Sequence, residues 1–142
     1  MKMSSEPKPT AILALLFFVG TALTAWAGGS DEAPTTAAPD DGLYRSYSED
    51  EFLKAADTGR VIFFHASWCP SCRTAEEDIK ANIGVIPDDI VVFKADYDLE
   101  KALKQDYGIT YQHTFVYVDS SGKAITKWSG GGAAEIAANV GR

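Results

Sequence analysis

The stretch VIFFHASWCPSC, residues 61–72, decides the fold of this chain. Residues 61–64 are continuously apolar and rich in β-forming side chains, as expected of a strand that is covered on both faces. Pro70 suits the first turn of a helix, so the stretch predicts a strand that leads through a short loop into a helix. Cys69 and Cys72 are the only cysteines among the 142 residues, and they stand where that helix begins.

Strands and helices are expected to alternate on both sides of this stretch. Ser48 and Glu51 form a capping box that opens a helix, and Gly59 ends it. Residues 119–122 indicate a hairpin turn. The resulting order, β-α-β-α-β-α-β-β-α, predicts an α/β domain with a mixed central sheet and helices on both faces. The expected elements are strand 44–47, helix 49–58, strand 61–64, helix 70–82, strand 89–95, helix 98–106, strands 115–119 and 123–128, and helix 133–140.

The first 42 residues are expected to precede the folded domain. Lys2 and Lys8 lie before an uncharged apolar run that ends in an Ala-x-Ala pattern at Ala27, so residues 1–27 are typical of a secretory signal peptide. An uncleaved N-terminal membrane anchor is the alternative. Residues 28–42 are small, acidic or proline and predict a flexible linker. The folded domain is therefore residues 43–142, located outside the cytoplasm.

Cys69 and Cys72 allow three interpretations. A structural disulfide between them would close a very small loop and contribute about 2 kcal/mol, against roughly 3 kcal/mol for a fifteen-residue loop. As a redox pair, Cys69 would be stabilised as a thiolate at the helix N-terminus, and Cys72, one turn along the same face, would attack a mixed disulfide. As a metal site, the two thiols would join His113, with or without His65, around Zn²⁺, Cu⁺ or an iron–sulfur cluster.

The motif Trp68-Cys69-Pro70-Ser71-Cys72 after a hydrophobic strand, within this order of elements, resembles the thioredoxin superfamily over nearly all of residues 43–142. The resemblance implies a thioredoxin-like fold and protein-disulfide oxidoreductase activity. It also implies that Cys69 is an exposed nucleophile, that Cys72 is the buried resolving thiol, and that no cofactor is needed besides their disulfide. Four residues are expected to support the pair: Trp68, which would shield one side of the site, Pro70, which holds the turn, and the histidines His113 and His65.

Two positions depart from the family's pattern. Phe63 stands where thioredoxins carry a buried carboxylate thought to help the resolving thiol lose its proton. His65, on the same strand face, is the candidate substitute, and a packed histidine is the alternative. His113 stands at the place of the family's cis-proline. Because a cis bond before a non-proline residue costs about 3–4 kcal/mol, against 0.5–1 kcal/mol before proline, both a strained cis bond and a trans bond with a different groove stay open.

His113 is nonetheless expected near both sulfurs. Histidine titrates close to neutrality, so this side chain would lower the pKa of Cys69 or shuttle a proton. The alternative is a loop histidine without a function.

The sequence therefore predicts an extracytoplasmic thiol–disulfide oxidoreductase, periplasmic, secreted or tethered to a membrane. The reductase direction is slightly favoured, because no helical insertion of the oxidase type interrupts the domain. Expected partners are protein thiols or disulfides and a membrane protein that donates or accepts electrons. The protein is expected to be a monomer, and its formal net charge of −7 argues against nucleic-acid binding. The alternative is a metal-binding or metal-delivery protein that uses Cys69, Cys72 and His113.

Overall fold

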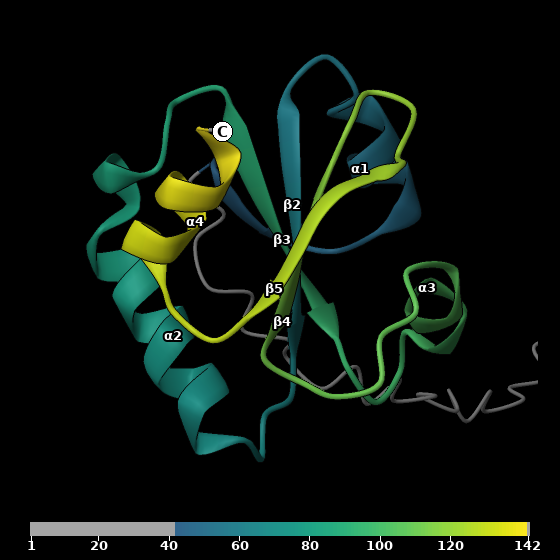
Figure 1. Cartoon of the computed structure of the whole chain (residues 1–142), viewed down its shortest axis with the longest axis vertical. Coiled ribbons are helices and arrows are strands. Elements are labelled where there is room, and N and C mark those ends of the chain that lie inside the picture. Colours follow the sequence, from purple (N-terminus) through teal and green to yellow (C-terminus); the bar gives the residue numbers. More distant parts are fainter. Residues whose placement is uncertain (1–41, 142) are drawn as a thin grey trace, which may run out of the picture. The chain divides into compact units, whose positions relative to one another are not determined.

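The computed structural model describes residues 42–141, which form a five-stranded mixed sheet with helices around it (Figure 1). The strand order is β1-β3-β2-β4-β5, with β1, β3 and β2 parallel and with β4 and β5 each antiparallel to its neighbour. The expected order of elements and the mixed sheet are confirmed. The elements are β1 (Tyr44–Ser46), α1 (Glu49–Lys54), β2 (Gly59–His65), α2 (Pro70–Ala81), the 3-10 turn η1 (Ile83–Val85), β3 (Ile90–Asp96), α3 (Lys101–Asp106), β4 (Thr114–Val118), β5 (Ala124–Ser129) and α4 (Ala133–Val140).

Helices cover both faces of the sheet, as expected: α2 and α4 lie on one face, and α1 and α3 on the other (Figure 1). The central strand β2 contributes to both cores. Val61 and Phe63 pack with α2 and α4, whereas Ile62 and Phe64 pack with α1 and α3, and none of the four is exposed. Each such side chain contributes roughly 1.5–3 kcal/mol on burial. A strand buried on both faces must be apolar throughout, which accounts for the uninterrupted run at residues 61–64.

The first helix begins as expected but ends early. Ser48 caps α1 by accepting a hydrogen bond from the backbone N–H of Glu51 at 3.3 Å. The helix stops at Lys54 rather than just before Gly59. The buried guanidinium of Arg60 donates to the carbonyl of Phe52 at 2.9 Å and also to two carbonyls of the β4–β5 turn. Arg60 thereby takes up a carbonyl that a longer helix would have bonded internally.

The third helix is also shorter than expected. It begins at Lys101, not at residue 98. The carboxylate of Asp96 accepts hydrogen bonds from the backbone N–H groups of Asp98 and Leu99, at 2.8 and 3.1 Å, and this holds the chain in a turn after β3. Such local side-chain bonds compete with helix formation.

The predicted signal segment, residues 1–27, and nearly all of the predicted linker, residues 28–42, lie outside the described residues. Within residues 42–141, no helix has the length and apolar character needed to cross a membrane.

Candidate active site

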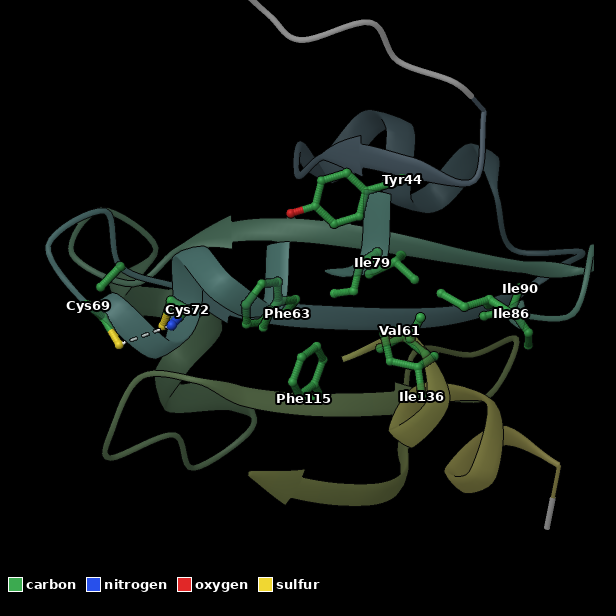
Figure 2. Packing of buried hydrophobic residues seen from close by; sticks show 14 residues of the cluster. Tyr44, Val61, Phe63, Cys69, Cys72, Ile79, Ile86, Ile90, Phe115 and Ile136 are labelled. Carbon is green, nitrogen blue, oxygen red and sulfur yellow. Dashed lines mark hydrogen bonds between the residues drawn. The ribbon is translucent and has the colours of Figure 1, made fainter. Parts of the chain in front are cut away.

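The two cysteines lie at the start of α2, directly after the loop that follows the central strand. Cys69 is the N-cap residue, and its Sγ accepts a hydrogen bond from the backbone N–H of Cys72 at 3.4 Å (Figure 2). Pro70 occupies the first turn, where its missing N–H costs nothing. Both thiols are free. The arrangement predicted from the motif, with Cys72 one turn after Cys69 on the same helix, is confirmed.

The thiol of Cys69 is prepared for ionisation. Its burial disfavours the thiolate, but hydrogen bonds from the side chain of Ser71, from Cys72 and from the side chain of Gln112 outweigh burial and lower the pKa of Cys69 to about 7. The Oγ of Ser71 lies 3.2 Å from the Cys69 sulfur. The expectation of an exposed nucleophile is wrong in this structure, since Cys69 is only 4% exposed. The sequence interpretation assigned no role to Ser71 or Gln112, although both adjoin motif positions.

The thiol of Cys72, unlike that of Cys69, is kept protonated. Cys72 is fully buried beside Phe63 in the core between the sheet and α2 (Figure 2). Burial, together with the neighbouring Cys69, raises the pKa of Cys72 to about 11, although backbone groups of Ala66 and His113 oppose the shift. Cys72 is therefore protonated at neutral pH, whereas Cys69 ionises far more readily.

The segment before β4 lies across the two thiols. No peptide bond among residues 42–141 is cis, so the bond between Gln112 and His113 is trans. His113 instead adopts a left-handed conformation, with φ at 58°. Its backbone N–H donates to the carbonyl of Phe64, and its carbonyl accepts from the N–H of Gly130, both at 2.9 Å. Of the two alternatives left open by the sequence, the structure has the trans bond.

Trp68 lies beside the motif but is more open than a shield would be. Its side chain is 55% exposed, and its Nε1 donates to the carboxylate of Asp98 at 2.8 Å. This bond ties the cysteine loop to the loop after β3. Trp68 therefore presents an apolar surface next to Cys69.

His65, the last residue of β2, lies against a carboxylate of α2 that the sequence interpretation missed. Its Nε2 is 3.1 Å from Oε2 of Glu76, without the alignment of a hydrogen bond. Burial lowers the pKa of His65, against the attraction of Glu76. Glu76 also pairs with Lys80 at 2.7 Å and with Lys94 at 2.9 Å. Glu76 is four residues from both Cys72 and Lys80. This spacing places the three side chains on one face of the helix, and it could have identified Glu76 from the sequence.

Phe63, at the position of the missing carboxylate, is an ordinary core residue. Its ring stacks on Phe115 at a centroid distance of 4.4 Å, and the ring of Phe115 stacks on Trp128 at 5.4 Å. His113 extends this aromatic row, since its ring lies 5.9 Å from both Phe63 and Phe115.

A groove opens beside the helix start. Ser71, Thr74, Ala75 and Asp78 of α2 line one wall, and the other residues that line it are His113, Gly131 and Gly132. The metal alternative finds no support in the geometry. Within residues 42–141, no three histidine, cysteine or acidic side chains are arranged to hold an ion, so Cys69, Cys72 and His113 are not assembled as a ligand set.

The fold and the cysteine pair at the head of α2 define a thioredoxin-like protein. The thioredoxin family model matches residues 45–142, and the chain therefore belongs to the thioredoxin family, whose members are thiol–disulfide oxidoreductases.

Individual relatives agree with this assignment. The chain is 31% identical to thioredoxin H3 of Arabidopsis thaliana over 93 residues, which cover 63% of this chain and 77% of that protein. It is 28% identical to thioredoxin H4 of the same plant over 80 residues, 56% of this chain and 66% of that protein. The crystal structure of Trxlp from Edwardsiella tarda superposes with a TM-score of 0.59 and 23% identity, over 70% of this chain and 99% of that one.

Proposed function

We propose that this protein is an extracytoplasmic thiol–disulfide oxidoreductase that acts on protein substrates through Cys69 and Cys72. The observation that carries the proposal is the opposite tuning of two neighbouring thiols, with a pKa of about 7 for Cys69 and about 11 for Cys72. The thiolate is the reactive species. Cys69 is therefore the thiol that attacks the substrate, and Cys72 is the resolving thiol that reacts second.

The reaction follows from this order. The Cys69 thiolate attacks a substrate disulfide, one substrate thiol leaves, and a mixed disulfide remains on Cys69. Cys72 then gives its proton to solvent and attacks the Cys69 sulfur, which already lies 3.4 Å from the Cys72 backbone nitrogen. The bond between Cys69 and the substrate breaks, and the second substrate thiolate leaves and takes up a proton from solvent. The products are the Cys69–Cys72 disulfide and two substrate thiols. The electrons move between protein thiols only, so no diffusible cofactor takes part.

The reductase direction fits the modest activation of Cys69. A lower thiol pKa stabilises the reduced form and makes the disulfide more oxidising, and a strong oxidant has an attacking thiol with a pKa of about 3.5. Because the pKa of Cys69 is about 7, ionisation of Cys69 stabilises the reduced form of the pair far less than in such an oxidant. The pair is accordingly a donor of electrons to substrate disulfides.

The N-terminal residues support the proposed location. The apolar run before Ala27 is typical of a segment that directs the domain out of the cytoplasm, whether it is cleaved or kept as an anchor. In that compartment a membrane protein returns electrons to the Cys69–Cys72 disulfide. The exposed face of Trp68 contacts the protein substrate, and the domain works as a monomer.

Two measurements test the proposal. Cys69→Ser should abolish reduction of a protein disulfide such as that of insulin, whereas Cys72→Ser should accumulate a mixed disulfide with substrate. The reduction potential of the pair should lie near about −270 mV, the value that thioredoxins themselves show, rather than near about −120 mV. A wild-type protein that neither reduces nor oxidises any disulfide would refute the proposal.

A further inference from the structure

We propose that His113 donates a proton to the substrate thiolate that leaves when Cys69 attacks, so that this histidine is a general acid built into the groove. The inference rests on the proposed oxidoreductase function and assigns a task to one residue of that site.

The backbone of His113 is held in a left-handed conformation. A φ of 58° is uncommon for residues other than glycine, although histidine adopts it more often than most, as asparagine and aspartate do. Two backbone hydrogen bonds, to Phe64 and from Gly130, hold it there. Residues kept in such conformations by their surroundings cluster at functional sites. This geometry sets the direction in which the imidazole leaves the chain.

The imidazole of His113 is oriented by a hydrogen bond to Gly131. This bond also determines which ring nitrogen carries the proton. Nε2 lies 3.1 Å from the carbonyl oxygen of Gly131. Because a carbonyl oxygen only accepts hydrogen bonds, Nε2 carries a proton in both charge states of the ring. The proton that comes and goes is therefore on Nδ1. Among residues 42–141, Nδ1 has no hydrogen-bond partner, and it is not among the enclosed polar atoms.

His113 lies at the groove that opens beside the start of α2. His113 lines the same groove as Ser71, whose Oγ is 3.2 Å from the Cys69 sulfur. The preceding residue, Gln112, reaches the Cys69 thiolate with its side chain. In the proposed complex, a disulfide lies along this groove with one sulfur at Cys69 and its second sulfur toward His113.

The other charged groups around the ring are already engaged. The carboxylate of Asp78, on the α2 wall, accepts from the backbone N–H of Ala133 at 2.8 Å and from the Asn82 amide at 2.9 Å. Glu135, near Gly131, accepts from Asn139 at 3.2 Å. β2 and β4 meet the ring with Phe63 and Phe115, which do not titrate. Among the groove residues, His113 is thus the one whose side chain offers a ring nitrogen that is not engaged in a hydrogen bond.

The step balances as follows. The Cys69 thiolate forms a bond to the near sulfur of the substrate, and the substrate S–S bond breaks. The far sulfur leaves with the bonding electron pair and takes the proton from Nδ1 of the imidazolium. The neutral ring regains a proton from solvent before the next substrate.

The test uses two disulfides that differ in their need for a proton. An aliphatic disulfide of the cystine type expels a basic thiolate, whereas an aromatic disulfide such as dithiobis(nitrobenzoate) expels a stable anion. His113→Asn keeps the left-handed backbone, which asparagine tolerates. It should slow reduction of the aliphatic disulfide by about a hundredfold, the lower end of general acid catalysis, and that of the aromatic one by less than about threefold. The alkaline fall of the aliphatic rate should disappear.

Thr74→Val is the matched control, because it alters the groove wall and removes only a hydroxyl, which donates to the Pro70 carbonyl and is not an acid at neutral pH, and it should leave the ratio of the two rates unchanged. Alkylation of Cys69 by iodoacetamide involves no leaving thiolate, so its pH profile should be the same in wild type and His113→Asn. Equal slowing of both disulfides, or a shifted alkylation profile that explains the loss, would overturn the inference. A wild type inactive toward both disulfides would instead refute the proposed function.

Discussion

Oε1 of Glu76 lies 2.9 Å from Nζ of Lys94 and thereby joins the helix that carries both cysteines to the strand β3. The same carboxylate accepts from Lys80 at 2.7 Å and faces His65 at 3.1 Å. Burial of Glu76 opposes its ionisation, but the two lysines outweigh burial and lower the pKa of Glu76. A carboxylate with two cationic partners in a partly buried place favours the folded state.

Glu76→Gln should therefore destabilise the protein by about 1–2 kcal/mol at pH 7, in line with the loss of a charge-assisted hydrogen bond. Because the folded-state pKa of Glu76 is lowered, its contribution is present above about pH 4.5 and is lost as the pH falls through the folded-state pKa. Urea unfolding at pH 7 and at pH 3 measures both effects. Glu77→Gln, at the exposed neighbouring position, is the control and should change stability by less than about 0.5 kcal/mol. Equal losses in both variants would contradict this role of Glu76.

His65 should make stability depend on pH in a different window. Its folded-state pKa is lowered from 6.5, first by burial, so the unfolded chain binds a proton more readily than the folded one. Stability should fall as the pH drops below about 6.5 and level off, for this group, below the folded-state pKa. His65→Phe, which keeps an aromatic ring but cannot titrate, should flatten the decrease between pH 7 and pH 5. A variant with the same pH dependence as wild type would show that another group is responsible.

The cysteine positions could be predicted from the sequence, whereas the contacts of Glu76 could not. The positions of Cys69 and Cys72 follow from an apolar strand and a proline at a helix start, both of which are local features, and the structure agrees. No role was predicted for Glu76, because a glutamate within a helix usually faces solvent. Its partners come from β2 and β3, and only the register of the sheet brings His65 and Lys94 beneath α2.

The start of α1 could likewise be predicted from local sequence, but its end could not. The capping box at Ser48 fixes where α1 begins, because the cap and its partner are three residues apart. The early end of α1 depends on Arg60, whose side chain reaches from β2 to the helix and to the β4–β5 turn. The trans, left-handed geometry at His113 likewise depends on bonds to Phe64 and Gly130, which no pattern around residue 113 reveals.

The reactivity of Cys69 should depend on Ser71. The hydroxyl lies 3.2 Å from the sulfur and is the first of the hydrogen bonds that lower the pKa of Cys69. The rate of alkylation by iodoacetamide should be half-maximal near pH 7 in wild type, and Ser71→Ala should move that midpoint upward by up to about one unit, the equivalent of one net hydrogen bond. Ser67→Ala, an exposed serine in the same loop, should leave the midpoint in place. An unchanged midpoint in Ser71→Ala would mean that the helix start alone activates Cys69.

The proline of other thioredoxins should not be tolerated at position 113 in this chain. Proline fixes φ near −65°, whereas His113 has a φ of 58°, and proline lacks the N–H that donates to the Phe64 carbonyl at 2.9 Å. His113→Pro should therefore cost about 2–3 kcal/mol or more in urea unfolding, because the buried carbonyl of Phe64 loses its partner as well. His113→Gly keeps the N–H and adopts a positive φ without strain, so it should be near neutral in stability. If the proline variant were as stable as the glycine variant, the loop before β4 would have to rearrange, and the trans, left-handed geometry would be one of two conformations of nearly equal free energy.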